Sequence, residues 1–215
     1  MKKTLFALSL GLATVASNVQ AADVGPYAGI GAGLHMATKS AFDYESPPGT
    51  WAGESDVNFR LGYALSASAG YRWNDFTRTE IEISHRAAGL DNIAAEDAAG
   101  RQSALAISAN VLFDVGVGTN FYPYIGGGVG LANNKWKSVK TPTSPVYSDS
   151  NKAMQWQAIV GVEMPINAQT NWYVDYRFVG STSNDFNTIP TLARVVGVDL
   201  QSHNLMVGAR FRFGG

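Results

Sequence analysis

The stretch from Asn58 to Trp73 limits the possible folds of this chain more than any other segment. Its odd-numbered residues are apolar, while its even-numbered residues are small or polar and include Arg60 and Arg72. Side chains on a β-strand point alternately to opposite faces, so the pattern predicts a strand with one apolar and one polar face. Strands of soluble sheets have about five or six residues, whereas a membrane-spanning strand needs about nine to eleven, with aromatic residues at the interfaces. We interpret the stretch as one strand of a membrane-spanning β-barrel.

The N-terminus predicts export. Lys2 and Lys3 precede an apolar run, and Val19-Gln20-Ala21 fits a small-residue cleavage site. This arrangement is typical of a secretory signal peptide, and its apolar run is too short to span a bilayer. We therefore expect a signal peptide over residues 1–21, cleaved after Ala21 or Ala22, and a single barrel domain over residues 22–215.

Composition narrows the classes of function. The chain has no cysteine, so an exported barrel would depend on strand pairing rather than on disulfides. Removal of Lys2 and Lys3 takes two of the 16 basic residues away against 17 acidic residues, which gives no electrostatic case for nucleic-acid binding. No apolar run is long enough for a transmembrane helix.

Seven further segments alternate with the same period. They are Tyr27–Ala37, Arg78–Arg86, Ser103–Asp114, Tyr122–Ala132, Ala153–Met164, Trp172–Val179 and His203–Phe213. Short connections (74–77, 115–121, 165–171) alternate with long ones (38–57, 87–102, 133–152, 180–202), as periplasmic turns and extracellular loops do in outer-membrane barrels. The sequence predicts an all-β fold, an eight-stranded antiparallel up-and-down transmembrane β-barrel with both chain ends in the periplasm.

Charged residues follow the same alternation. None lies at an outward position of an expected strand, where Arg or Lys at the bilayer midplane would cost roughly 2–4 kcal/mol. The interior of an eight-stranded barrel is just wide enough for side chains to fill, and buried charges need partners. Inward glycines also leave room for water, so a narrow pore remains an alternative to a paired plug. The charged residues expected in one interior network are Arg60, Arg72, Arg78, Glu80, Glu82, Asp114, Glu163, Asp175, Arg177, Arg210 and Arg212.

Aromatic residues should form two girdles at headgroup depth. The periplasmic girdle would contain Tyr27, Tyr71, Trp73, Phe121, Trp172, Phe211 and Phe213, and the outer girdle Phe59, Trp156 and Phe178.

The chain resembles the small eight-stranded outer-membrane β-barrel family of OmpA-type and opacity-protein-like barrels. The resemblance is carried by Pro26–Gly33, Tyr122–Leu131, Trp172–Phe178 and His203–Phe213, and it covers the whole expected mature chain. It implies a cell outer membrane location in a Gram-negative bacterium and insertion by the outer-membrane assembly machinery, which reads an aromatic-ended last strand. Here Gly214 and Gly215 follow that strand, a departure from the family pattern. The assembly-signal candidates are Leu205, Val207, Ala209, Phe211 and Phe213.

No catalytic constellation is found. His35, His85 and His203 are expected at the outer rim, but two residues further on stand Ala37, Ala87 and Leu205, where barrel lipid A deacylases have a serine. The glycines of 126–130 continue a strand and lack the following helix and Lys-Ser/Thr pair of a phosphate loop. We expect no enzymatic activity, no cofactor and no metal.

The long loops carry the remaining functional signal. Lys135, Trp136 and Lys137 in one loop and Phe42 and Tyr44 in another fit either a binding surface or contact with lipopolysaccharide. We expect a structural or adhesion-type surface protein with a host or surface ligand bound by its loops. A narrow porin-like channel and an outer-leaflet lipid hydrolase are the alternatives. The expected partners are outer-membrane lipid, lipopolysaccharide and the assembly machinery.

Overall fold

The computed structural model describes residues 24–38, 40–45, 51–93, 96–115, 121–140, 147–182, 184–189, 193–198 and 200–213. The expected signal peptide, Gly214 and Gly215 lie outside the described residues. In the part that the structure describes, no helix has the length and apolar character needed to cross a membrane.

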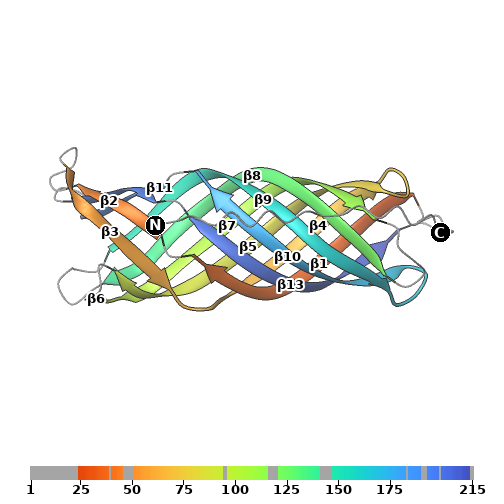
Figure 1. Ribbon diagram of the computed structural model, residues 1–215, viewed down its shortest axis with the longest axis horizontal. Coiled ribbons are helices and arrows are strands. Elements are labelled where there is room, and N and C mark those ends of the chain that lie inside the picture. The colour runs from red at the N-terminus through yellow and green to blue at the C-terminus, as the bar shows by residue number, and fades with distance from the viewer. Residues whose placement is uncertain are drawn as a thin grey trace, which may run out of the picture.

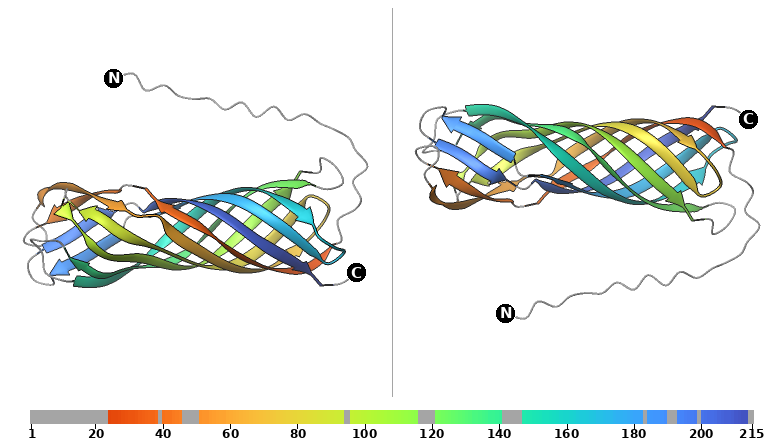
Figure 2. Two further views of the ribbon diagram at one scale, coloured as in Figure 1. Left: turned by 90° about the horizontal axis from the view of Figure 1, so that it is seen from below. Right: turned by 90° about the horizontal axis from the view of Figure 1, so that it is seen from above.

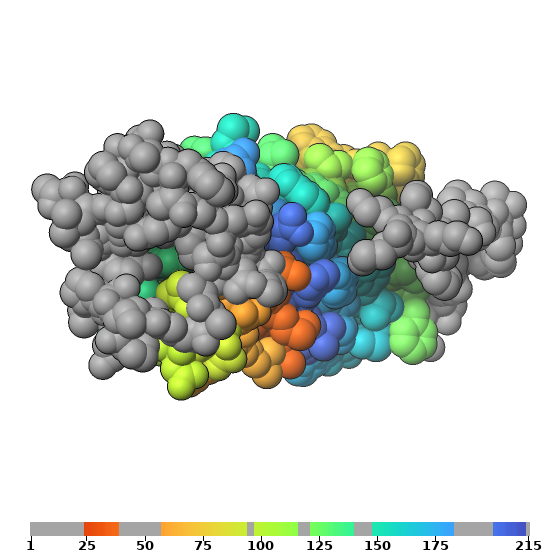
Figure 3. All heavy atoms as spheres, turned by 60° about the vertical axis from the view of Figure 1, so that its left-hand side comes forward, coloured from red at the N-terminus to blue at the C-terminus, as the bar shows by residue number. Residues whose placement is uncertain are grey.

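Eight long antiparallel strands close into a barrel (Figure 1). They are β1 (Gly25–Ala37), β4 (Gly62–Arg72), β5 (Thr77–Ile93), β7 (Ala99–Asp114), β8 (Tyr122–Lys140), β9 (Tyr147–Pro165), β10 (Thr170–Ser181) and β13 (Gln201–Arg212). The first of these strands closes the barrel, because β1 pairs with β4 on one side and with β13 on the other. Figure 3 shows this seam, where the orange of β1 lies beside the blue of β13. The predicted fold is confirmed.

The short connections lie at the end of the barrel where the described chain begins and ends. The backbone N–H of Phe213 donates to the carbonyl oxygen of Pro26 at this end. Two of the turns have the same construction, in which an asparagine side chain holds the turn. Asn74 Oδ1 accepts from the N–H groups of Phe76 and Thr77, and Asn167 Oδ1 accepts from those of residues 169 and 170. Such local bonds are the physical reason that asparagine favours turns.

At the opposite end, the described parts of the long connections form strands (Figure 2). These strands are β2 (Ser40–Glu45), β3 (Trp51–Phe59), β6 (Glu96–Asp97), β11 (Asn184–Ile189) and β12 (Ala193–Val198). They form the order β11-β12-β2-β3-β5 beyond the barrel, while β8 and β9 extend far past their expected ends at Ala132 and Ala153. We call this strand-built region the outer extension.

The prediction of one strand from Asn58 to Trp73 is wrong. Strand β3 ends at Phe59 and β4 begins at Gly62. The strand is therefore interrupted at Arg60 and Leu61, which are both exposed. Odd-numbered Val57 is buried before the break, whereas odd-numbered Leu61 is exposed after it. A shift of one residue exchanges the two faces of a strand, so the break reverses which residues face inward. The part that crosses the membrane is β4, with 11 residues.

Apolar side chains cover the outside of the barrel wall. They alternate with buried polar side chains along each strand, for example in β7, where Leu105 and Ile107 are exposed and Ser108 and Asn110 are buried. The exposed apolar residues of the other strands include Ile30, Leu65, Ile83, Ile125, Val129, Met154, Val160, Val174 and Val207. This surface is the lipid-facing belt.

Two expected girdle residues do not face lipid. Tyr27 is 4% exposed and points into the lumen, because it shares the inward face of β1 with the buried Gly29 and His35. Phe59 packs inside the outer extension, because it precedes the reversal at Arg60. Other girdle residues are exposed as expected, including Trp73 and Phe213 at the turn end and Trp156 near the extension.

Candidate functional site: the barrel interior

Charged side chains in the turn-side half of the lumen form one cluster of ion pairs. Arg78 of β5 lies between Asp114 of β7, at 3.1 Å, and Glu163 of β9, at 2.6 Å. Arg72 of β4 pairs with Asp114 at 2.6 Å, and Arg210 of β13 pairs with Glu163 at 2.7 Å. All five side chains are buried. The cluster connects strands from all around the barrel, so it crosses the lumen.

Tyrosine rings pack against these arginines. The guanidinium carbon of Arg210 lies 4.2 Å from the ring centre of Tyr173 and 4.9 Å from that of Tyr124. The guanidinium carbon of Arg78 lies 4.7 Å from the centre of the Tyr124 ring. Contacts of this kind stabilise a cation by roughly 0.5–2 kcal/mol, more where water is absent. The rings therefore fill the space between the ion pairs with favourable contacts.

Inward glycines make room for these rings rather than for an open path. A Cβ atom added to Gly161 would lie 2.6 Å from the Tyr124 ring and 2.6 Å from Cβ of Asp175. A Cβ atom added to Gly208 would lie 2.4 Å from the Tyr173 ring. At these positions a side chain from another strand occupies the volume that the glycine leaves.

A second cluster lies further toward the outer extension. Arg177 of β10 pairs with Asp175 at 2.8 Å and also with Glu82 of β5. The hydroxyl of Tyr124 donates to Asp175 at 2.9 Å, which joins this cluster to the one around Arg78. Removal of one partner from a buried ion pair costs about 3–5 kcal/mol. A change in the arrangement of either cluster would break such pairs and is therefore unfavourable.

Uncharged side chains complete the network on the β5–β9 side. Gln157 donates to Asn110 at 2.7 Å, and Asn110 donates to Glu80 at 3.2 Å. The hydroxyl of Tyr27 donates to Glu80 from β1 at 3.1 Å. Glu80 therefore has neutral donors instead of a direct arginine partner among the described residues.

One residue expected in the interior network, Arg60, lies outside the lumen, and Arg212 lies at the edge of the network, where it lines a small cavity with Arg72, Arg78, Glu163 and Arg210. Arg60 is on the outside near the extension, where its Nε is 3.1 Å from Asp91 and both side chains are exposed. It is outside because the break at Arg60 and Leu61 reverses the alternation that the sequence pattern assumes. Arg212 lies at the turn-side mouth and donates to the carbonyl oxygen of Ala168 at 2.9 Å. The other expected residues are all buried in the lumen: Arg72, Arg78, Glu80, Glu82, Asp114, Glu163, Asp175, Arg177 and Arg210.

The interior network expected from the sequence does not include Arg86, but the structure places this residue in the lumen. Its guanidinium donates to Gln155 Oε1 at 2.6 Å, and it makes no ion pair with a described carboxylate. Arg86 lies on the same inward face of β5 as Glu80 and Glu82. The alternation of the sequence therefore already indicated that Arg86 faces the lumen.

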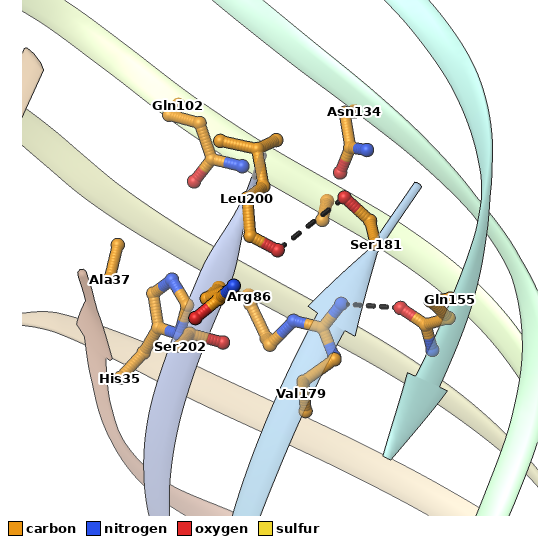
Figure 4. Close-up of a pocket in the computed structure, with 12 residues that line it drawn as sticks. His35, Ala37, Arg86, Gln102, Asn134, Gln155, Val179, Ser181, Leu200 and Ser202 are labelled. Carbon is orange, nitrogen blue, oxygen red and sulfur yellow. Dashed lines mark hydrogen bonds between the residues drawn. The ribbon is translucent and has the colours of Figure 1, made fainter. Parts of the chain in front are cut away.

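Arg86 lines a polar cavity in the outer half of the lumen (Figure 4). Around it lie His35, Gln102 and Asn134, and Leu200 closes the side toward the extension. His35 was expected at the outer rim, but it is 3% exposed inside the barrel with its Nδ1 2.7 Å from Asn204 Oδ1, because it lies on the inward face of β1.

The other two histidines face outward on the wall. His85 packs against the Tyr63 ring at 5.8 Å between ring centres, and His203 packs against Tyr176 and Phe178. The hydroxyl of Tyr176 is 2.5 Å from Nδ1 of His203. Both histidine rings therefore pack against aromatic side chains on the outside of the wall.

Above the cavity, an apolar cluster fills the outer extension. Its buried members are Val57, Leu90, Ala98, Trp136 and Val139, and Leu200 packs against them. Trp136 was expected on an exposed loop, but it is 1% exposed, because β8 continues as a strand and carries this residue on its inward face. Since Leu200 contacts both this cluster and the cavity, the cluster covers the outer side of the cavity.

Comparison with known proteins decides the family. The family model described as the outer membrane protein β-barrel domain matches residues 5–213. The chain belongs to this family. Its place is accordingly the outer membrane of a Gram-negative cell.

Solved structures of other outer-membrane barrels share the fold. The outer membrane protein OprG from Pseudomonas aeruginosa matches with a TM-score of 0.68 at 14% identity, over 89% of this chain and 97% of that one. The Neisserial surface protein A matches with a TM-score of 0.54 at 18% identity, over 91% of this chain and 100% of that one. A search of curated proteins finds no match.

The outward face of the last strand carries the residues named as assembly-signal candidates. Leu205, Val207 and Phe211 are exposed on β13, Ala209 is half-buried between them, and Phe213 is exposed directly after the strand. Their role in assembly stays a prediction.

Within the described part of this family member, no group of three His, Cys, Asp or Glu side chains could hold a metal ion. Each of the described carboxylates in the lumen accepts a bond from a neighbouring side chain.

Proposed function

We propose that this protein is a non-conducting barrel of the bacterial surface, in which the barrel anchors the outer extension and the extension acts as an interaction surface for a host or surface ligand. The proposal rests on the way in which side chains fill the lumen. Two joined ion-pair clusters cross it, around Arg78 and around Arg177, and an apolar cluster covers its outer end.

A conducting path would need a continuous column of water. In the turn-side half, Arg78, Glu163 and Arg210 meet at 2.6 and 2.7 Å with tyrosine rings packed against them. Opening this layer would break buried ion pairs, each worth about 3–5 kcal/mol when one partner loses the other. A path through the closed arrangement is therefore energetically unfavourable.

Conductance of the refolded full chain tests the closed lumen. We expect no current steps in planar bilayers under conditions in which a general porin gives clear ones. A reproducible conductance that requires the protein would overturn this part of the proposal.

Expression on whole cells tests the interaction surface. We expect cells that carry the protein to bind at least one member of a panel of immobilised extracellular-matrix proteins and glycans more strongly than cells that lack it. Binding that never depends on the protein would contradict an adhesion-type role.

A narrow channel is the second candidate, and the polar cavity around Arg86 and His35 favours it. Nε2 of His35 and Oε1 of Gln102 have no hydrogen-bond partner among the described residues, so this part of the lumen can hold water. The conductance recording described above separates the two candidates. A lipid hydrolase is the third, and unchanged lipid A in the mass spectra of cells that overexpress the protein would exclude it.

The proposal includes export through a signal peptide over residues 1–21 and insertion by the assembly machinery. The outward side chains of β13 would supply the recognised strand.

A further inference from the structure

Exposed cations gather on the outer wall where three neighbouring strands leave the lipid-facing belt. They are Arg101 on β7, Lys135 and Lys137 on β8, and Lys152 on β9. Their neighbours along the strands, Gln102, Asn134, Trp136 and Ala153, are buried and face inward, so the cations face outward. We call these four residues the outer basic patch.

The register of the sheet brings the four side chains close together. Arg101 lies directly opposite Lys137 in the β7–β8 pair. In the β8–β9 pair, Lys135 lies opposite Ser150 and Lys152 lies opposite Asn133, so the two lysines are diagonal neighbours. Directly opposite residues have Cβ atoms about 4.5–5.5 Å apart, and diagonal neighbours are within reach of long side chains. The patch is therefore continuous across three strands.

No acid of the described part compensates the patch. None of the four cations makes an ion pair with a described carboxylate, and like charges directly opposite each other are unfavourable. The nearest acid along β9 is Asp149, which lies opposite the inward-facing Trp136 and so points to the inside of the extension. On another part of the wall, Arg60 differs because Asp91 pairs with it. An external anion would relieve the repulsion within the patch.

The height of the patch indicates what kind of anion meets it. On the same outward faces, the next exposed residues toward the turn end are apolar, among them Leu105, Leu131 and Met154. Lys152 lies two residues from Met154 on the side of the extension, a distance of about 7 Å along a strand. The patch therefore begins where the apolar belt ends, which is the depth of the lipid headgroups. It lies at the extension end of the barrel and so faces the outer leaflet.

We propose that the outer basic patch binds the phosphate groups of the outer-leaflet glycolipid, lipopolysaccharide. Lysine and arginine bind phosphate through strong charge-assisted hydrogen bonds, and cations at a membrane surface each strengthen binding to anionic lipid. A headgroup with two phosphates can contact cations on more than one strand at the same time, which a single free phosphate does not. The inference is independent of whether the lumen conducts.

Binding to defined glycolipid tests the proposal. The full chain is refolded into nanodiscs and titrated with fluorescent lipopolysaccharide that carries both lipid A phosphates. Replacement of both central lysines, K135Q with K137Q, should weaken binding about fivefold for each cation removed. The matched control is R60Q, which removes an exposed cation at the same end that already has an acid partner, and it should leave binding unchanged.

Three further measurements decide the outcome. Dephosphorylated lipopolysaccharide should bind the wild-type protein at least as weakly as the intact form binds the double variant, which keeps Arg101 and Lys152. Inorganic phosphate at millimolar concentration should not displace the glycolipid. Equal binding of wild type and double variant, equal binding of both lipid forms, or full displacement by free phosphate would each overturn the proposal. Heat-modifiable migration on gels shows whether each variant is folded, and exposed side chains of this kind are not expected to affect folding.

Discussion

Arg78 and Glu163 meet across the lumen, with Nη1 of Arg78 2.6 Å from Oε2 of Glu163, although β7 and β8 separate their strands in the barrel wall. Arg210 approaches the same carboxylate oxygen at 2.7 Å from the other side. One carboxylate therefore holds two arginines from separate strands, β5 and β13, which makes Glu163 the centre of the turn-side cluster.

Loss of this carboxylate should be severe. Glu163→Ala leaves two buried guanidinium groups without their shared partner, and we expect the free energy of unfolding to fall by about 3–5 kcal/mol. Urea unfolding in lipid vesicles measures the change. Asp91→Ala is the matched control, because it breaks an exposed pair with Arg60 and should cost less than about 1 kcal/mol. Similar costs at the two positions would contradict the assigned burial.

The two arginines of the outer half should respond differently to neutral substitution. Arg177→Met leaves Glu82 and Asp175 without their cation and should destabilise by about 3–5 kcal/mol. Arg86→Met removes a hydrogen bond to Gln155 and no ion pair, so we expect a cost of about 1–3 kcal/mol. Unfolding of both variants in parallel gives the comparison. An Arg86 variant that is the less stable of the two would point to a carboxylate partner that the structure does not show.

Depth along one strand should decide the cost of a new charge on the outer wall. Val207 and Gln201 both lie exposed on the same face of β13, and Val207 is in the middle of the apolar belt. Val207→Lys should destabilise by roughly 2–4 kcal/mol, whereas Gln201→Lys near the extension should cost about 0–1 kcal/mol. Unfolding in vesicles of fixed lipid composition tests the difference. Equal costs at the two positions would contradict the placement of Val207 in the middle of the apolar belt.

Labelling of whole cells should report the orientation of the barrel. A cysteine in place of Lys137 is exposed in the outer extension, and one in place of Asn74 is in a turn at the opposite end. We expect an impermeant thiol reagent to label the first and not the second, because the chain has no cysteine of its own. Labelling at position 74 alone would invert the orientation.

The sequence predicts the barrel because period-two alternation depends only on neighbouring residues. In β7 and β9 the inward and outward positions follow from that period, and the lack of charge on the outward faces of 103–114 and 153–164 indicates lipid. The same reasoning fails at Arg60 and Leu61, because a break of this kind leaves the alternating pattern intact while it reverses the faces. It also fails for β8 beyond Ala132, where the mixed residues of 133–140 resemble a loop until pairing with β9 makes them a strand.

By itself, the sequence determined which residues of each barrel strand face the lipid and which face the lumen, since that information is local. Only the tertiary structure decided which inward side chains meet. Arg78 finds Glu163, and Arg177 finds Glu82, through the closure and stagger of the barrel, and these depend on all eight strands together. The outer basic patch has the same origin, because Arg101 and Lys137 are neighbours only in the register of the paired strands.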